Sequence, residues 1–210
     1  MYAVGHLALG YITGKTVSKA TKTSINLPLI FALSILPDID LVFLRNMHRG
    51  PTHSIILLVL LSLPFLAIFK RRMLPYLASI ASHVLIGDMI NGPVKIFWPL
   101  TQQWYGLPLA SGSQIMVSLE WAFFLISLMM MFMSKDFRKM LKLDYSGLLL
   151  VLPLASAGLP LVLRYYTSLS LFIPQLFYTV YFSLSIILCF RNLIGPRETH
   201  ANAATETGTD

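Results

Sequence analysis

The stretch MHRGPTHSI, residues 47–55, places two histidines five positions apart across a Gly-Pro turn, between segments that are strongly apolar. Of the whole chain, 56% of the residues are apolar and only 12% are charged, and the mean hydropathy is +0.70. Soluble domains carry roughly 25% charged residues, so this chain has too few charges to cover a surface that faces water. The sequence therefore predicts an integral membrane protein whose main partner is the lipid bilayer.

The apolar segments predict an all-α fold, a polytopic transmembrane helical bundle of six or seven segments, some broken or short. We expect helices at residues 2–14, 25–44, 54–69, 73–90, 115–133, 146–163 and 168–190. At about 1.5 Å per residue the first helix reaches only about 20 Å, which is less than a full span. The second is interrupted by Pro37 and two aspartates, and proline ends or kinks a helix because it has no backbone N–H.

We predict a single transmembrane domain over residues 1–194, with a metal-site half at 1–114 and scaffold helices at 115–194. The polar residues 195–210 predict a disordered cytoplasmic tail. With loops alternating between the two sides, the basic residues separate into Lys15, Lys19, Lys22, Lys70, Arg71, Arg72, Lys135, Arg138, Lys139, Lys142, Arg191 and Arg197 against Arg45, Arg49, Lys95 and Arg164. This bias predicts a multi-pass plasma membrane protein with its N-terminus outside and its C-terminus in the cytoplasm.

The net charge of +7 comes from residues at the ends of the apolar segments, where they act as topology signals, so we expect no nucleic-acid partner. Cys189 is the single cysteine, which excludes an internal disulfide. The first apolar run has no basic region before it, so no cleavable signal peptide is expected. The sequence leaves the oligomeric state open.

Side chains that can bind a metal interrupt several apolar segments: His6, Asp38, Asp40, His48, His53, His83 and Asp88. Charged groups inside membrane segments cost roughly 2.5–3.5 kcal/mol each, so they persist when they pair with each other or with ions. Imidazoles and carboxylates together suit Zn²⁺, Mn²⁺ or Fe²⁺. We therefore predict a divalent metal site at the outer face, with zinc or manganese preferred. The set exceeds the ligands of one tetrahedral zinc, so either two ions bind or some residues orient ligands or act as base.

Each of these residues also has a purely structural interpretation. His48 and His53 could be loop histidines at a headgroup interface, and the two aspartates could be helix caps. His83 could be a buried histidine bonded to a serine or to the backbone. Arg49 either binds a phosphate or carboxylate or is an interfacial arginine. Glu120 is expected to be a supporting residue around the site.

Taken together, the motifs GHL (5–7), LPDID (36–40), HRGPTHS (48–54) and SH…D (82–88), ending in FWP (97–99), resemble the YdjM-type family of predicted membrane-bound metal-dependent hydrolases. The resemblance covers residues 5 to about 100, and the remaining helices are similar only in general character. It implies a multi-pass prokaryotic membrane protein with a hydrolytic metal centre.

One motif departs from the family, which usually reads His-x-x-x-Asp. Here Asp88 lies five positions after His83, which on an ideal α-helix turns the two side chains roughly 140° apart. Gly87 between them could end the helix or host a π-bulge, and either would bring both side chains inward.

The leading functional hypothesis is a membrane-bound metal-dependent hydrolase, in which a metal-activated water attacks an ester or phosphoester. Asp40 or Asp88 would be the base and Arg49 would stabilise the anion. Because the site faces the outer leaflet, an amphiphilic substrate such as a lipid phosphoester is a candidate. One alternative is a metal or ion transporter, for which the last two helices lack a matching polar set. The other is a non-catalytic membrane protein with a structural metal.

Overall fold

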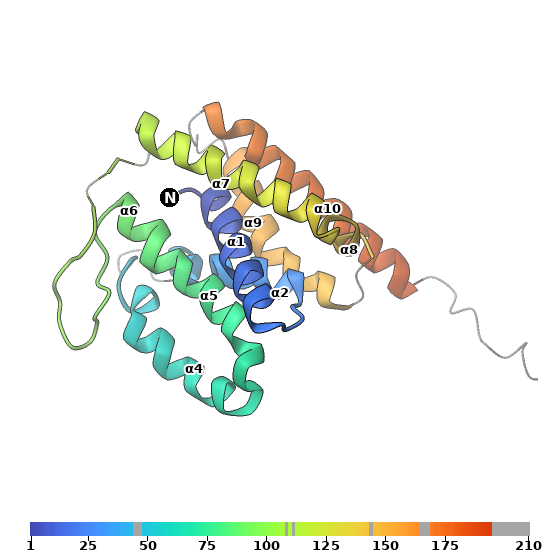
Figure 1. The fold of residues 1–210 in the computed structure, drawn as a ribbon. Coiled ribbons are helices and arrows are strands. Elements are labelled where there is room, and N and C mark those ends of the chain that lie inside the picture. Colours follow the sequence, from blue (N-terminus) through green and yellow to red (C-terminus); the bar gives the residue numbers. More distant parts are fainter. Residues whose placement is uncertain (44–47, 108, 111, 143–144, 164–168, 195–210) are drawn as a thin grey trace, which may run out of the picture.

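The computed structural model describes residues 1–43, 48–107, 109–110, 112–142, 145–163 and 169–194. Within them the chain forms helices and no strand, apart from one isolated bridge between Val94 and Tyr105, so the predicted all-α fold is confirmed. The α-helices (Figure 1) are α1 (Ala3–Thr21), α2 (Leu27–Ile35), α3 (Asp40–Phe43), α4 (Ile55–Phe69), α5 (Leu74–Ser82), α6 (Met89–Asn91), α7 (Gln114–Met133), α8 (Asp136–Met140), α9 (Val151–Val162) and α10 (Phe172–Ile194). The predicted tail, residues 195–210, lies outside the described residues, and the division into a metal-site half and a scaffold half stays a prediction.

Shorter helical turns connect several of these elements. The 3₁₀ turns are η1 (Leu36–Ile39), η3 (Pro51–His53), η4 (Lys70–Met73), η6 (Tyr145–Leu150) and η7 (Leu169–Leu171), and η5 (His83–Asp88) is a π-helical turn. The predicted break in residues 25–44 is confirmed: α2 ends at Ile35 and η1 follows with Pro37 in its first turn. Proline fits there because its missing N–H is not needed at the start of a helical turn.

Among the described residues, three helices are long and apolar enough to cross a membrane: Gln114–Met133, Tyr145–Val162 and Phe172–Arg191. They coincide with the three helices predicted over residues 115–190. Leu27–Ile39 is apolar but shorter. The helix predicted at 54–69 starts one residue later, because Ser54 is its N-cap and its Oγ accepts the N–H of Leu57 at 3.3 Å.

Several boundaries differ from those predicted, and one contact explains two of the differences. The first helix does not end before Lys15 but runs to Thr21, and the segment predicted as the loop 134–145 contains α8. Lys15 is buried and its ammonium pairs with Asp136 of α8, so its charge does not need to leave the helix bundle. Burial alone would raise the pKa of Asp136, but hydrogen bonds from Lys139 and Lys15 hold it below its ordinary value.

Helix α1 lies at the centre of the fold and packs against α2, α5 and α7 (Figure 1). Two glycines make the approach of α2 possible: a Cβ on Gly10 would lie 2.2 Å from the Cβ of Ser34, and one on Gly14 would lie 2.7 Å from Cδ1 of Ile30. Small residues at such contacts let helix backbones come close together. This packing holds the start of α1 beside η5 and the end of α2, where the candidate ligands lie.

The loop after α6, predicted at residues 91–114, is non-helical in its described residues from Gly92 to Ser113, because Asn91 ends α6 and Gln114 begins α7. It extends beside α6 and α4 as a long excursion (Figure 1). The bridge between Val94 and Tyr105 closes it, and the carbonyl of Ile96 accepts the N–H of Ile55 at 2.9 Å. The loop therefore fixes the first residue of α4, directly after the second histidine of the HRGPTHS motif.

Candidate metal centre

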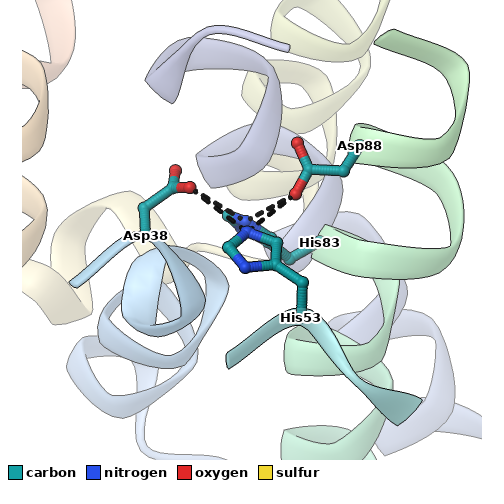
Figure 2. A group of neighbouring side chains, drawn as sticks. All are labelled: Asp38, His53, His83 and Asp88. Carbon is teal, nitrogen blue, oxygen red and sulfur yellow. Dashed lines mark ion pairs between the residues drawn. The ribbon is translucent and has the colours of Figure 1, made fainter. Parts of the chain in front are cut away.

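Four of the predicted ligands come from three separate segments and meet in one place (Figure 2). Asp38 stands on η1, which begins after the end of α2, and His53 closes the turn η3. His83 and Asp88 are the first and last residues of η5. We call Asp38, His53, His83 and Asp88 the primary group.

The distances within the primary group are those of ligands around one ion. Nε2 of His53 lies 3.5 Å from Oδ1 of Asp38 and 3.0 Å from Oδ2 of Asp88. Nε2 of His83 lies 3.4 Å and 3.2 Å from the same two oxygens. Four ligands at zinc–nitrogen and zinc–oxygen distances of about 2.1 Å stand about 3.4 Å apart at the corners of a tetrahedron. The four contacts match the edges of such a polyhedron.

The hydrogen bonding of these atoms tests whether a cation fits. Nε2 of His53, Nε2 of His83 and Oδ2 of Asp88 are buried; their contacts with one another are ion pairs, and none of the three has a hydrogen-bond partner among the described residues. Buried polar atoms of native proteins nearly always have a partner, and an ion is one accepted explanation for an exception. All three point to the same small volume, and two imidazoles with two carboxylates are a donor set for a divalent transition metal. The residues therefore fit a metal ion.

The far nitrogen of each imidazole is held in a way that leaves Nε2 for a metal. Nδ1 of His83 lies 2.7 Å from the carbonyl oxygen of Ser34, to which it can only donate. Nδ1 of His53 lies 2.9 Å from Oγ1 of Thr52, whose hydroxyl donates to Asp40, and 3.3 Å from Oδ2 of Asp40 itself. A metal-binding histidine commonly donates its other N–H to a carbonyl or carboxylate, which fixes the tautomer and the ring orientation. His83 shows this arrangement directly, whereas in His53 the hydroxyl of Thr52 stands between Nδ1 and the carboxylate of Asp40.

Asp40 belongs to a second cluster on the other side of His53. Its Oδ1 lies 2.9 Å from Nδ1 of His48, and its Oδ2 accepts the hydroxyl of Thr52 at 2.5 Å. Asp40, His48 and His53 could also hold an ion, and we call them the secondary group. The two groups share His53, so simultaneous occupation would require its imidazole to bridge two ions.

His6 and Arg49 lie in neither group but surround the outer oxygen of Asp88. Nε2 of His6 is 3.6 Å and Nη2 of Arg49 is 3.5 Å from Oδ1 of Asp88. The His6 ring also stacks on His83, with ring centroids 3.8 Å apart and planes inclined by 18°. A Cβ on Gly87 would lie 2.5 Å from Cε1 of His6, so only glycine leaves room for this ring.

The unusual spacing of His83 and Asp88 is resolved by the π-helical turn η5. Hydrogen bonds from i to i+5 widen the turn, so five residues make little more than one turn instead of leaving the side chains on opposite faces. Both side chains face inward, with 3.2 Å between Nε2 of His83 and Oδ2 of Asp88. Of the two possibilities for Gly87, the structure contains the π-helical one.

The electric field of the carboxylates is strong at His53. Burial alone would lower the pKa of His53, but the three surrounding carboxylates raise it to about 11. Two of these carboxylates belong to the primary group and the third is Asp40. The imidazole of His53 is therefore protonated when no metal ion is bound. The site attracts positive charge, and a metal must displace that proton to bind.

Several supporting residues were not identified from the sequence. Thr52 bonds Asp40, the carbonyl of Ser34 holds His83, and Gly87 gives space to His6. The position of Thr52 inside the HRGPTHS motif is the one signal that could have pointed to it. Oε1 of Glu120 accepts the N–H of Tyr2 at 2.6 Å, which anchors the first turn of α1 ahead of His6; its role around the site stays a prediction.

Comparison with known proteins agrees with this description. The model of the YdjM inner membrane protein family matches residues 1–166, a range that contains every member of both groups. The comparisons with curated proteins and with solved structures gave no significant match.

Proposed function

Since this chain belongs to the YdjM inner membrane protein family, we propose that it is a membrane-bound hydrolase whose divalent metal is held by the primary group. The observation that carries the proposal is the convergence on one small volume of buried nitrogen and oxygen atoms that have no hydrogen-bond partner among the described residues. We take zinc or manganese as the metal, and one ion as the normal content. The orientation of the chain, with the site towards the outer face, remains part of the proposal.

A bound divalent metal would supply a water activated near neutral pH and would polarise an ester or phosphoester. Asp40 keeps Nε2 of His53 directed at the metal through the opposite ring nitrogen. Asp40 also holds His48 by Nδ1, which leaves Nε2 of His48 as the atom that takes a proton. Arg49 brings positive charge to the same end of the site, where it would bind an anionic substrate.

One of the four ligands is open to solvent, so a substrate could reach an ion in the site. The side chains of His53, His83 and Asp88 are at most 2% exposed, whereas that of Asp38 is 18% exposed. Asp38 is therefore the ligand at the open side. A six-coordinate ion held by the four residues would keep two further positions for water and substrate.

The first test is the metal content of detergent-purified protein. We expect about one equivalent of zinc or manganese in the wild type and in His200→Ala, and none in His53→Ala/His83→Ala. The substrate test is turnover of a p-nitrophenyl phosphodiester or ester, lost in the same double variant while it still inserts in the membrane. Bound metal without turnover on any ester would refute the hydrolase.

One observation favours a structural metal as the second candidate. Four protein ligands complete a tetrahedral zinc, and closed sites of this kind are usually structural. The ligands also come from η1, η3 and η5, so an ion would fix these segments together. In that case chelation would lower the melting temperature strongly, and no ester or phosphoester would be turned over.

A further inference from the structure

An apolar groove of about 850 Å³ runs between α4 and the pair α2 and α5. Helix α4 stands apart from the rest of the bundle (Figure 1). Leu33 of α2, Leu58 and Phe65 of α4, and Leu77 and Ile80 of α5 are among the residues that line the groove. The volume lies within the range of roughly 300–1,000 Å³ found for ligand pockets. It is therefore large enough for a specific ligand, and its walls are suited to hydrocarbon.

One end of the groove adjoins the metal centre. Pro37 and Ile39, which flank Asp38 in the sequence, both line the groove, as do Pro51 and Thr52, which directly precede His53. The most exposed ligand of the primary group thus lies between two groove-lining residues. A molecule in the groove would have one end beside the two segments that carry Asp38 and His53.

The groove is strongly asymmetric in polarity along its length. The segments beside its site end carry the aspartates, the histidines and the cationic Arg49, which do not themselves line the groove, whereas the walls along α4 are almost entirely apolar. Arg72 lines the far end, where an arginine covers apolar surface with its stem while its charge stays in water. Helix α4 has 15 residues and is about 22 Å long, which exceeds the roughly 15 Å of one leaflet of hydrocarbon. This pattern is complementary to an amphiphile with one long chain along α4.

We propose that the groove binds a hydrocarbon chain of a membrane lipid and places the ester or phosphoester of its head at the primary group. The inference rests on the proposed function for what happens at the head, but the chain-binding site stands on the groove itself. The bilayer is the source of the ligand, because this is an inner membrane protein and α4 exposes Leu61 and Ile68, each 70% exposed, beside the groove. A chain leaving the bilayer can enter the groove without crossing water.

Ser62 is the residue with which to block the groove. It is small, buried and groove-lining, and its hydroxyl donates to the carbonyl of Leu58 in the same helix at 2.5 Å, so its replacement breaks no contact between helices. Ser62→Trp would fill the groove with an indole. Leu63→Trp is the matched control, because Leu63 is the next residue, is 51% exposed and does not line the groove. Leu33→Trp blocks the groove from α2 if the first variant does not fold.

The probe is hexadecyl phosphate, detected as a bound adduct by native mass spectrometry after release from detergent micelles. We expect one adduct on the wild type and on Leu63→Trp, and about tenfold less on Ser62→Trp, because the indole displaces buried methylene contacts. Butyl phosphate should give no retained adduct. Equal retention of hexadecyl phosphate by all variants would overturn the proposal. A change of oligomeric state in Ser62→Trp without loss of the adduct would also overturn it, because it would mean that a second copy of the chain occupies the groove.

Hydrolysis distinguishes failure of this inference from failure of the proposed function. Hexadecyl and methyl p-nitrophenyl phosphodiesters are compared on the same variants. Loss of the adduct in Ser62→Trp with no turnover of either ester would uphold the chain site and refute the hydrolase. Metal-dependent turnover that is equal for both esters and unaffected by Ser62→Trp would uphold the hydrolase and refute the chain site.

Discussion

Gly87→Ala is the most specific change that can be made near the metal centre without touching a ligand. A Cβ at this position would lie 2.5 Å from Cε1 and 2.6 Å from Nδ1 of His6. Carbon atoms in contact stand about 3.5–4.0 Å apart, so the His6 ring must move by about 1 Å. It is stacked on His83 with centroids 3.8 Å apart, so the movement is passed to a ligand of the primary group.

The expected cost follows from the packing of these rings. Overpacking a buried contact costs about 1–3 kcal/mol, which corresponds to about 5- to 150-fold in metal affinity if the strain falls on the site. Alanine is also the better helix former by about 1 kcal/mol. We therefore expect the melting temperature of the metal-free protein to change little while metal affinity falls.

The assay is competition for zinc and manganese against a chelating dye in detergent-purified protein. Gly158→Ala is the control, because its new Cβ would meet nothing closer than Cγ2 of Thr179, at an ordinary 3.4 Å. His6→Ala removes the ring that causes the clash, so adding Gly87→Ala to His6→Ala should have no further effect. An affinity of Gly87→Ala within twofold of the wild type, or an equal loss in the His6→Ala background, would refute the reasoning.

Three further outcomes are expected. Asp40→Asn should weaken metal binding by about 10- to 100-fold, measured with the same dye, because it removes the carboxylate charge behind the Thr52 hydroxyl that faces Nδ1 of His53. Metal affinity should rise by about tenfold per pH unit between pH 6 and 8, in titrations at fixed ionic strength, because the pKa of His53 is raised to about 11 and its proton must leave on binding. Asp136→Asn should lower the free energy of unfolding by about 3 kcal/mol and leave metal content unchanged, because it strands the buried Lys15 at the opposite end of α1; calorimetry and metal analysis would show this.

The sequence determined the class of fold and the chemical character of the site. Its low charge and long apolar segments leave no alternative to a helical membrane protein, and proline within LPDID already implied the break after α2. The prediction of a metal site rested on imidazoles and carboxylates in segments where unpaired charge is costly. These properties are local: they depend on composition and on the backbone chemistry of single residues.

The length of α1 and the presence of α8 were not predictable, because they depend on an ion pair between residues more than a hundred positions apart. In the sequence alone, the charge of Lys15 indicates the end of an apolar segment. In the structure its ammonium pairs with Asp136, and the helix continues beyond it. The groove beside α4 is of the same kind, since an apolar helix gives no sign of which of its faces meets a neighbour and which leaves a space.

The sequence identified the candidate ligands but could not assign each of them to the primary or the secondary group. Asp38 and Asp40 are two residues apart and chemically identical, yet one faces Nε2 and the other Nδ1 of His53. Whether Asp88 could join His83 depended on a π-helical turn and on the space that Gly87 leaves for His6. The number of residues between two positions predicts the relative directions of their side chains only when the helix is regular. Which residue can share an ion is decided by distances between segments, and only the packing of α1, η1, η3 and η5 sets those.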